Sequence, residues 1–375
     1  ILRIVSGLLI LIFFTLYVSS GIIAGGKSFE SFFGLDFKFG AIFTLAIVVF
    51  YTFFGGFRAV CITDAFQGML MFLVLVAVPV VAFCNLNLPD GATFWNEVSK
   101  YGKNHLNIFY DQTFLSILGL MAWGLGYFGQ PHIIVRFMAI RSSKELAQAR
   151  RIGIGWMAIG LAGAMMSGLI GFVYYSELNL PLADPEKVFL QLGETLFHPF
   201  FVGIIISAVL SAIMSTISSQ LLVSASSVTQ DFVFAFYKKE ISQKTQVAAG
   251  RYAVVAVALV ATALAFSFNE SVLNVVGYAW AGFGASFGPV LLFSLYWRRM
   301  SALAALLGMI TGGATVIAWI ALGLNSYVYE ILPGFAVSCI VIYLTSLYGD
   351  AIDKMSNEPN SATVQDEFEK MKTRL

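Results

Sequence analysis

The stretch Met121-Ala-Trp-Gly-Leu-Gly-Tyr-Phe-Gly-Gln-Pro-His132 lies inside an apolar run that extends from Phe114 to Val135. That run is long enough to cross a bilayer, because about 20 helical residues span the hydrocarbon. Its four glycines, from Gly119 to Gly129, and the following Pro131 predict a broken helix at mid-membrane depth. Backbone groups freed in lipid are tolerated only where they line a cavity. Discontinuous helices of this kind hold substrate and coupling ion in secondary transporters.

Two further patterns lie within this stretch. Gly124, Gly126 and Gly129 spell GxGxxG, but the dinucleotide fingerprint needs a preceding strand in a soluble βαβ unit, so we exclude it. Trp123 and Tyr127 are four residues apart and project from one helical face. They are candidates for a ligand-binding surface, and the alternative is that they are packing or interfacial aromatics.

The composition of the whole chain agrees with a membrane protein. Of its 375 residues, 58% are hydrophobic and only 11% are charged, whereas globular domains carry about 25% charged residues. The chain therefore lacks the charge to cover a water-exposed surface, which argues against a soluble enzyme or a disordered protein. Its net charge of +1 gives no support to a nucleic-acid partner.

Ten apolar runs are long enough to span a bilayer. Only helices or closed barrels satisfy the backbone in lipid, and the runs lack the alternation of barrel strands. We therefore predict an all-α, polytopic membrane protein with about ten helices. The runs are Ile4–Ile23, Phe39–Phe57, Ala65–Cys84, Phe114–Val135, Ile152–Tyr175, Phe197–Val233, Tyr252–Phe268, Val272–Trp297, Ala302–Leu322 and Ile331–Leu347.

Charges in the loops predict the orientation of these spans. Seventeen lysines and arginines fall at alternate loops and in the C-terminal tail, against five on the opposite side. By the positive-inside rule both ends of the chain are cytoplasmic. We expect a membrane domain over residues 1–350 and a solvated cytoplasmic tail over 351–375. Because the chain opens at Ile1 without Met and soon enters an apolar run, we also expect its natural N-terminus to be missing.

Constellations that would support an enzyme are absent from the sequence. The carboxylates lie in loops, at helix ends or in the tail, and no buried acid pair is evident. His105, His132 and His198 share no metal-like spacing, and the three cysteines lie far apart. We predict that the protein is not an enzyme.

The run Phe197–Val233 is too long for one perpendicular span and has no Pro after Pro199, which predicts a single long helix. Hydroxyl residues crowd one face of it, at Ser207, Ser211, Ser215 and Ser218. Small hydroxyl residues often serve only close helix packing. The alternative is that one or two hydroxyls bind a hard cation such as Na⁺, which prefers oxygen donors. Similarly, the glycine-rich segment Gly277–Pro289 is either a hinge or a close-packing surface.

Four segments resemble the sodium:solute symporter family, and within it the members that carry L-proline. The resemblance covers nearly the whole chain, with its motifs in the same order. The segments are Gly55-Gly-Phe-Arg-Ala-Val-Cys-Ile-Thr-Asp64, Trp123-Gly-Leu-Gly-Tyr-Phe-Gly-Gln-Pro-His132 with Arg136-Phe-Met, Met214-Ser-Thr-Ile-Ser-Ser-Gln220, and Tyr278-Ala-Trp-Ala-Gly-Phe-Gly-Ala-Ser-Phe-Gly-Pro289.

The resemblance implies the leucine-transporter fold of two inverted five-helix repeats, whose first helices precede Ile1 and are absent here. It implies sodium-coupled symport of L-proline by alternating access, in a bacterial inner membrane, with the lipid bilayer as surroundings, no nucleic acid and no obligate protein partner. By the same resemblance, Na⁺ is bound by the carbonyl of Ala212 and the hydroxyls of Ser215 and Thr216. Substrate-binding positions are Trp123, Tyr127 and Pro131, and Tyr17 contributes to coupling.

Two alternatives to proline symport remain. One is a sodium symporter of the same family for another solute, such as pantothenate or a sugar. The other is a symporter-like membrane domain of a sensor, which the short tail after Asp350 argues against because it holds no kinase domain.

Overall fold

A computed structural model describes residues 1–356, apart from 89, 91, 102–103, 105, 108, 181–183, 234–240 and 268–270. His105 and most of the predicted tail therefore lie outside the described residues. Within them the chain is helical and contains no strand. The helices form two compact units, and the division between the units falls within helices α1 and α9.

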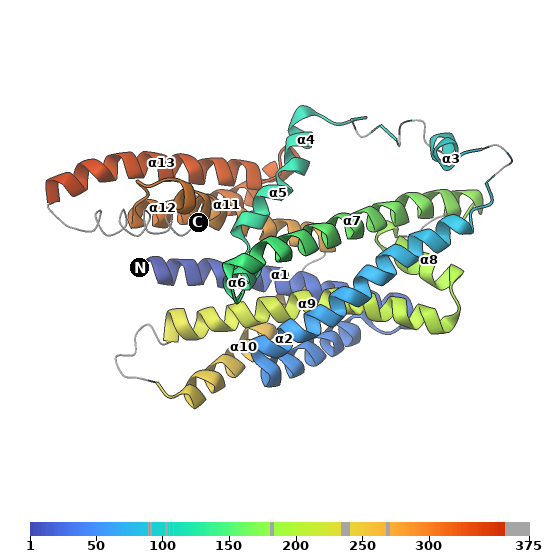
Figure 1. The fold of residues 1–375 in the computed structure, drawn as a ribbon, viewed down its shortest axis with the longest axis horizontal. Helices are drawn as coiled ribbons and strands as arrows, with labels where there is room; N and C mark the ends of the chain where they lie inside the picture. The colour runs from blue at the N-terminus through green and yellow to red at the C-terminus, as the bar shows by residue number, and fades with distance from the viewer. Residues whose placement is uncertain are drawn as a thin grey trace. The chain divides into compact units, whose positions relative to one another are not determined.

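The first unit comprises residues 1–20, 113–138 and the chain from Gln220 onward. Long helices dominate it, and the segment after Thr113 is instead divided into short pieces (Figure 1). Its elements are the start of α1 (Leu2–Phe33), α4 (Phe114–Met121), α5 (Trp123–Gly126), η1 (Tyr127–Gly129), α6 (Pro131–Met138), the end of α9 (Pro199–Ser227), the π-helical η4 (Val228–Val233), α10 (Gln243–Ala265), α11 (Val272–Tyr296), α12 (Ala302–Ala321), η6 (Leu324–Ser326) and α13 (Ile331–Ser356).

Helix α11 forms the centre of this first unit. It packs against α12, α13 and the short pieces α5 and η1. The ring of Phe283 is fully buried and lies 5.7 and 4.3 Å from the rings of Phe13 and Phe14 on α1. Because this helix is buried on most sides, apolar residues occupy all its faces and its sequence shows no amphipathic pattern.

The glycine-rich segment Gly277–Pro289 lies inside α11, which runs unbroken from Val272 to Tyr296 with Pro289 in its interior. A Cβ at Gly282 would overlap the ring of Phe13, and one at Gly284 would overlap Ile331. These glycines therefore allow close packing of neighbouring elements, which is the second of the two alternatives offered by the sequence.

The second unit comprises residues 21–112 and 139–219. Its principal contact is between α2 and α7. Its elements are the end of α1, α2 (Phe37–Cys84), α3 (Phe94–Tyr101), η2 (Ser143–Glu145), α7 (Leu146–Glu177), η3 (Pro185–Lys187), α8 (Val188–Leu196) and the start of α9.

Helix α2 consists of two helices that meet at Gly56. This residue has φ 58° and ψ −162°, which lies in a region that only glycine populates readily. The two halves correspond to the predicted runs Phe39–Phe57 and Ala65–Cys84. Large side chains such as Phe50 and Phe66, 67% and 70% exposed, line the outer faces of both halves, as expected for surfaces that contact lipid.

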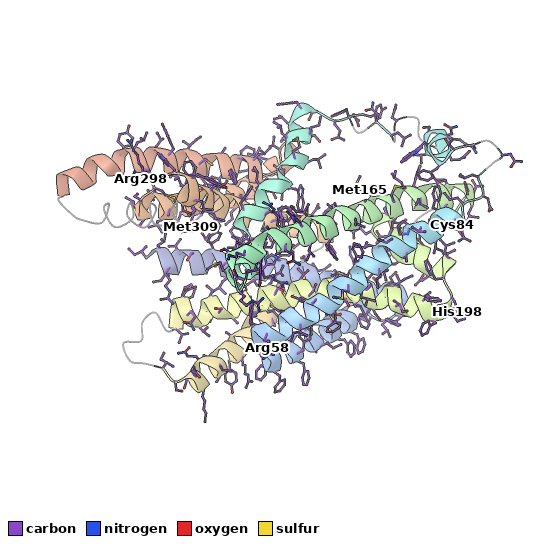
Figure 2. All side chains as sticks on the ribbon, in the orientation of Figure 1. Arg58, Cys84, Met165, His198, Arg298 and Met309 are labelled. Carbon is purple, nitrogen blue, oxygen red and sulfur yellow. The ribbon has the colours of Figure 1, made fainter. Side chains whose placement is uncertain are left out.

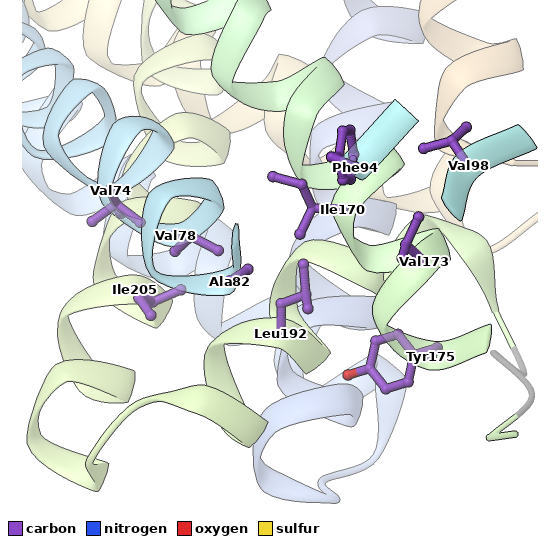
Figure 3. Close-up of a cluster of buried hydrophobic side chains, with 11 residues drawn as sticks. Val74, Val78, Ala82, Phe94, Val98, Ile170, Val173, Tyr175, Leu192 and Ile205 are labelled. Carbon is purple, nitrogen blue, oxygen red and sulfur yellow. The ribbon is translucent and has the colours of Figure 1, made fainter. Parts of the chain in front are cut away.

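The core of the second unit is a cluster of buried apolar side chains (Figure 3). Val74 and Val78 on α2 meet Ile170 and Val173 on α7, and Leu192 on α8 completes the contact. Because lipid tails are as apolar as these side chains, it is their close van der Waals packing that holds the three helices together.

The membrane-spanning helices agree with the ten predicted runs. Within the described part of the chain, eight helices are long and apolar enough to cross a bilayer, and Phe114–Gly129 is a shorter apolar segment. Counting the halves of α2 separately accounts for all ten runs. Residues 199–233 form one uninterrupted helical segment, as predicted, whose last turn is π-helical.

The structure also describes the end of α13 and the three cysteines. Helix α13 continues to Ser356, so the first residues of the predicted tail are helical. Cys61, Cys84 and Cys339 form no disulfide, and Cys84 lies at the C-terminal end of α2 (Figure 2). The chain therefore gains no stability from disulfides among these three residues.

Candidate functional site: a broken helix and a hydroxyl cluster

The predicted break in the helix is present, and it is concentrated at one residue. Residues 114–129 keep near-helical geometry through α4, α5 and η1, and Ala122 has φ −67° and ψ −14°. Gln130 has φ −85° and ψ 106°, after which Pro131 begins α6. The ring of a proline disfavours the helical region for the residue before it, which accounts for the position of the break. The prediction of a discontinuous helix is confirmed.

The glycines before the break have a different function from the one the sequence suggested. Residues 114–129 stay near-helical, and two of the glycines, Gly126 and Gly129, let other elements approach the helix closely. A Cβ at Gly126 would overlap the indole of Trp280, and one at Gly129 would overlap the carbonyl of Phe283. At Gly126 and Gly129 the glycines make room for neighbouring elements, and the extended residue at the break directly precedes Pro131.

The three aromatic candidates all meet the same side chain, the buried indole of Trp280. Ring centroids of Trp123, Tyr127 and Tyr17 lie 5.8, 4.9 and 6.5 Å from it. Trp280 also donates a hydrogen bond from Nε1 to the carbonyl oxygen of Trp123, at 2.9 Å. Tyr127 remains 46% exposed. The structure thus groups residues from α1, α5, η1 and α11 into one aromatic surface with an accessible edge.

Around the break lie polar side chains that are buried within this same unit. Gln130 is fully buried, and neither atom of its side-chain amide has a hydrogen-bond partner among the described residues. The ring of His132 lies 5.5 Å from Phe14 and 6.1 Å from Tyr17. A buried amide without partners costs free energy. Pro131 therefore places polar groups that could meet a ligand next to the aromatic surface.

The proposed sodium donors lie together on α9 in the second unit. The hydroxyls of Ser215 and Thr216 both donate to the carbonyl oxygen of Ala212, at 3.1 and 3.0 Å. Donating one hydrogen bond leaves the lone pairs of each hydroxyl oxygen available to a cation. The three oxygens form a compact, uncharged donor set of the kind that a hard monovalent cation prefers.

One turn further along α9, a carboxylate joins the hydroxyls. The hydroxyl of Ser219 lies 3.2 Å from Oδ2 of Asp64 and 2.8 Å from the carbonyl oxygen of Ser215. From the first half of α2, the Tyr51 hydroxyl donates to the carbonyl oxygen of Met214, at 2.9 Å. Asp64 therefore belongs to the polar surroundings of the hydroxyl cluster.

Comparisons with known proteins identify the family. The model of the sodium:solute symporter family matches residues 1–312. The chain belongs to the sodium:solute symporter family. It is 50% identical over 351 residues to the high-affinity proline transporter PutP of Bacillus subtilis (strain 168), an alignment covering 94% of this chain and 74% of that protein. A sodium/proline symporter of Staphylococcus aureus is 49% identical over 356 residues, covering 92% and 69%.

A solved structure confirms the fold. The substrate-bound, outward-open state of a Na⁺-coupled sialic acid symporter matches with a TM-score of 0.73 over 92% of this chain and 74% of that one. At 18% sequence identity this likeness concerns the fold alone. The predicted all-helical, leucine-transporter-like fold is therefore confirmed, and the protein is a multi-pass membrane protein of a Na⁺-coupled transporter family.

Two residues of the site were missed by the sequence reasoning. The only signal for Trp280 was its place within the segment Tyr278–Pro289, because no sequence spacing links it to Trp123, Tyr127 or Tyr17. Asp64 directly precedes the predicted span Ala65–Cys84 and lies eight residues after the kink at Gly56, inside the second half of α2. Its contact with Ser219 joins positions 155 residues apart, and no local pattern reports such a contact.

Proposed function

We propose that the protein couples the entry of Na⁺ into a bacterial cell to the uptake of L-proline by alternating access. The observation that carries the proposal is the discontinuous helix, whose break at Gln130 adjoins an aromatic surface with an exposed edge. The names of the two relatives, a proline transporter and a sodium/proline symporter, support the choice of solute. The protein then moves its substrate without converting it chemically.

In this proposal Na⁺ is bound by the carbonyl of Ala212 and the hydroxyls of Ser215 and Thr216. Uncharged oxygens suit an ion that must be released again, since a buried carboxylate would hold it more tightly and cost more to desolvate. The shared acceptor at Ala212 supports this assignment, because it holds both hydroxyls within 3.1 Å of a single oxygen.

The pyrrolidine ring of L-proline lies against Trp123, Tyr127 and Tyr17, with Pro131 setting the break. A compact apolar ring matches an aromatic surface, and its secondary ammonium can interact with the ring faces. The buried amide of Gln130 supplies hydrogen-bonding capacity next to this surface. Binding of the solute would therefore satisfy polar groups that have no partner among the described side chains.

We further propose that the protein lies in the bacterial inner membrane with both ends of the chain in the cytoplasm. The distribution of seventeen and five basic residues supports this orientation. Arg58, after the kink in α2, and Arg298, after α11, are two of the cytoplasmic residues (Figure 2). A potential of about 100 mV supplies about 2.3 kcal/mol per charge. A tenfold Na⁺ gradient adds about 1.4 kcal/mol, so one Na⁺ per proline supports accumulation of several hundred-fold.

The sodium assignment is tested with Ser215→Ala and Thr216→Ala, expressed from the complete gene and reconstituted in liposomes. We expect each variant to raise the half-saturating Na⁺ concentration for proline uptake about tenfold, as for loss of one hydrogen-bonding ligand. Ser207→Ala is the matched control, because its hydroxyl is exposed on the same helix and bonds the carbonyl of Gly203. If all three variants have the same half-saturating Na⁺ concentration, the hydroxyls of Ser215 and Thr216 serve helix packing and do not bind Na⁺.

The solute assignment is tested by competition and by substitution. Unlabelled L-proline should compete with labelled proline uptake, whereas pantothenate should not. Trp123→Ala and Tyr127→Ala should raise the half-saturating proline concentration while leaving the amount of protein in the membrane unchanged. Competition by pantothenate equal to that by proline would contradict the choice of solute. A loss confined to protein yield would make the aromatic residues structural.

A further inference from the structure

The indole of Trp123 is covered on one face by a residue from a distant part of the chain, Tyr329. The two rings stack with their centroids 5.5 Å apart and an angle of 19° between their planes. Offset stacking at such a distance is a favourable arrangement of two aromatic rings. Tyr329 lies in the connection between α12 and α13. A residue outside the discontinuous helix therefore contacts a member of the proposed solute surface.

Tyr329 is itself anchored to neighbouring elements. Its hydroxyl donates a hydrogen bond to the carbonyl oxygen of Gly277 on α11, at 3.0 Å. A Cβ at Gly277 would lie 3.9 Å from both the Trp123 ring and the Tyr329 ring, so the backbone of α11 meets both rings at this point. The residue before Tyr329 is held as well, because Nε1 of Trp319 donates to the carbonyl oxygen of Val328 at 3.0 Å. These bonds give the ring of Tyr329 a defined position.

The discontinuous helix leaves room for this tyrosine. A Cβ at Gly119 on α4 would lie 3.3 Å from the Cβ of Tyr329 and 3.7 Å from its backbone nitrogen. The shorter of these distances is tighter than an ordinary van der Waals contact, so a larger residue would push the connection away from α4. The glycine at position 119 therefore lets Tyr329 approach the helix that carries Trp123.

Without the stack, the indole would have space to turn. Trp123 and Tyr329 both border a cavity of about 420 Å³, which Glu330, 2% exposed, also lines. The hydrogen bond from Trp280 holds the backbone of Trp123 through its carbonyl oxygen, and it does not restrict rotation about the side-chain bonds of Trp123. The stack with Tyr329 therefore opposes rotation of the indole into the cavity.

We propose that Tyr329 is a positioning residue, which fixes the indole of Trp123 and thereby limits the size of the solute ring that the aromatic surface accepts. The proposal rests on the proposed function, in which Trp123 contacts the pyrrolidine ring of L-proline. When the indole is fixed, a ring larger than pyrrolidine has to displace it and break the stack. When the indole is free to turn, the larger ring is accepted at a smaller cost, so the preference for proline falls.

The test compares two substitutions of Tyr329, expressed from the complete gene and reconstituted in liposomes. Tyr329→Leu removes the stacked ring, whereas Tyr329→Phe keeps the ring and removes the hydroxyl that anchors it to Gly277. Tyr327→Ala is the matched control, because Tyr327 lies in the same connection and is 75% exposed. Uptake of labelled L-proline is measured alone and in competition with pipecolic acid, the six-membered homologue of proline.

We expect Tyr329→Leu to raise the half-saturating proline concentration about two- to tenfold, as for loss of one aromatic pair, with an unchanged maximal rate. The preference for proline over pipecolic acid should fall by a similar factor. Tyr329→Phe should give a smaller change in the same direction, and Tyr327→Ala should behave as wild type. A lower maximal rate with an unchanged preference in both Tyr329 variants would overturn the proposal, because a merely structural residue would act in that way.

A direct measurement on the indole separates this proposal from the proposed function. The purified protein is labelled with 5-fluorotryptophan, and the fluorine resonance of Trp123 is the one missing from Trp123→Phe. In Tyr329→Phe this resonance should shift and broaden, because a ring without its hydroxyl anchor moves and frees the indole. In Gly119→Ala it should also shift, since the added Cβ crowds Tyr329 without altering an aromatic residue. Tyr327→Ala should leave it unchanged.

The outcomes of the two experiments are distinct. An unchanged Trp123 resonance in both Tyr329→Phe and Gly119→Ala would overturn the positioning role, even if the protein carries proline. A shifted resonance with an unchanged preference for proline would overturn the limit on ring size. If the wild type takes up neither imino acid, the proposed function fails, whereas a shifted resonance would still support the positioning of Trp123 by Tyr329.

Discussion

The close contact between Gly126 and Trp280 leads to a quantitative prediction. A Cβ at Gly126 would overlap the indole, so Gly126→Ala forces either α5 or Trp280 to move. Overpacking of this kind costs about 1–3 kcal/mol. Movement of the indole also breaks the 2.9 Å hydrogen bond from Trp280 to the carbonyl oxygen of Trp123. Loss of a buried hydrogen bond costs about 1–3 kcal/mol more.

Against these losses, alanine is favoured over glycine in a helix by about 1 kcal/mol. We therefore expect Gly126→Ala to lower the free energy of unfolding by about 1–5 kcal/mol. Because Trp280 also contacts Tyr127 and Tyr17, the same change should raise the half-saturating proline concentration. The two assays are thermal unfolding in detergent and labelled-proline uptake into liposomes.

Gly124→Ala is the matched control for this prediction. A Cβ at Gly124, two residues earlier, would meet no described atom within 4 Å. It should leave uptake unchanged and raise the free energy of unfolding by at most about 1 kcal/mol. Equal stability and equal proline affinity in the two variants would refute the reasoning, because it would mean that the indole of Trp280 does not depend on the glycine beneath it.

Three further changes have definite expected results. Gly56→Ala should lower the free energy of unfolding by about 1–3 kcal/mol, because φ of 58° strains any residue with a Cβ. Gly68→Ala in the same helix should leave the free energy of unfolding unchanged, since a Cβ there meets no described atom within 4 Å. Denaturation of both variants measures the difference. Since the pKa of Glu330 is raised, its contribution to stability is full below about pH 4.5 and is lost as the pH rises through the raised pKa. Glu330→Gln should therefore flatten the decline in thermal stability between acidic and neutral pH, and an unchanged decline would contradict this. Arg3→Ala breaks the 2.8 Å ion pair with Asp231, and because the pair is partly exposed the change in unfolding free energy should stay below about 1 kcal/mol.

Much of the fold could be predicted from local patterns. The ten apolar runs coincide with the helices because each helix in lipid must form its own backbone hydrogen bonds. A run of consecutive apolar residues is therefore enough to predict where such a helix lies and how long it is. The break before Pro131 was predictable for the same reason, since proline restricts the residue directly before it. The exact residue, Gln130, follows from that rule rather than from the glycines nearby.

The contacts that assemble the candidate site could be predicted from the sequence only in part. Trp123 and Tyr127 share a face by spacing, and Ser215, Thr216 and Ala212 lie within one turn, so these sets are local. Trp280 joins the aromatic residues from 157 positions away, and Asp64 reaches Ser219 across 155 positions. Contacts at such separations depend on how helices pack, which no local spacing reports.

The sequence by itself determined that this chain is a helical membrane protein with a discontinuous helix and a hydroxyl-rich helix, and its motifs indicated the family. Only the tertiary structure decided that Gly126 makes room for the indole of Trp280, that Gly282 and Gly284 make room for Phe13 and Ile331, and that Glu330 is buried beside a cavity. The physical reason is one of range. Backbone hydrogen bonding and proline sterics act between near neighbours in the chain, whereas close packing and burial act between surfaces that meet only after folding.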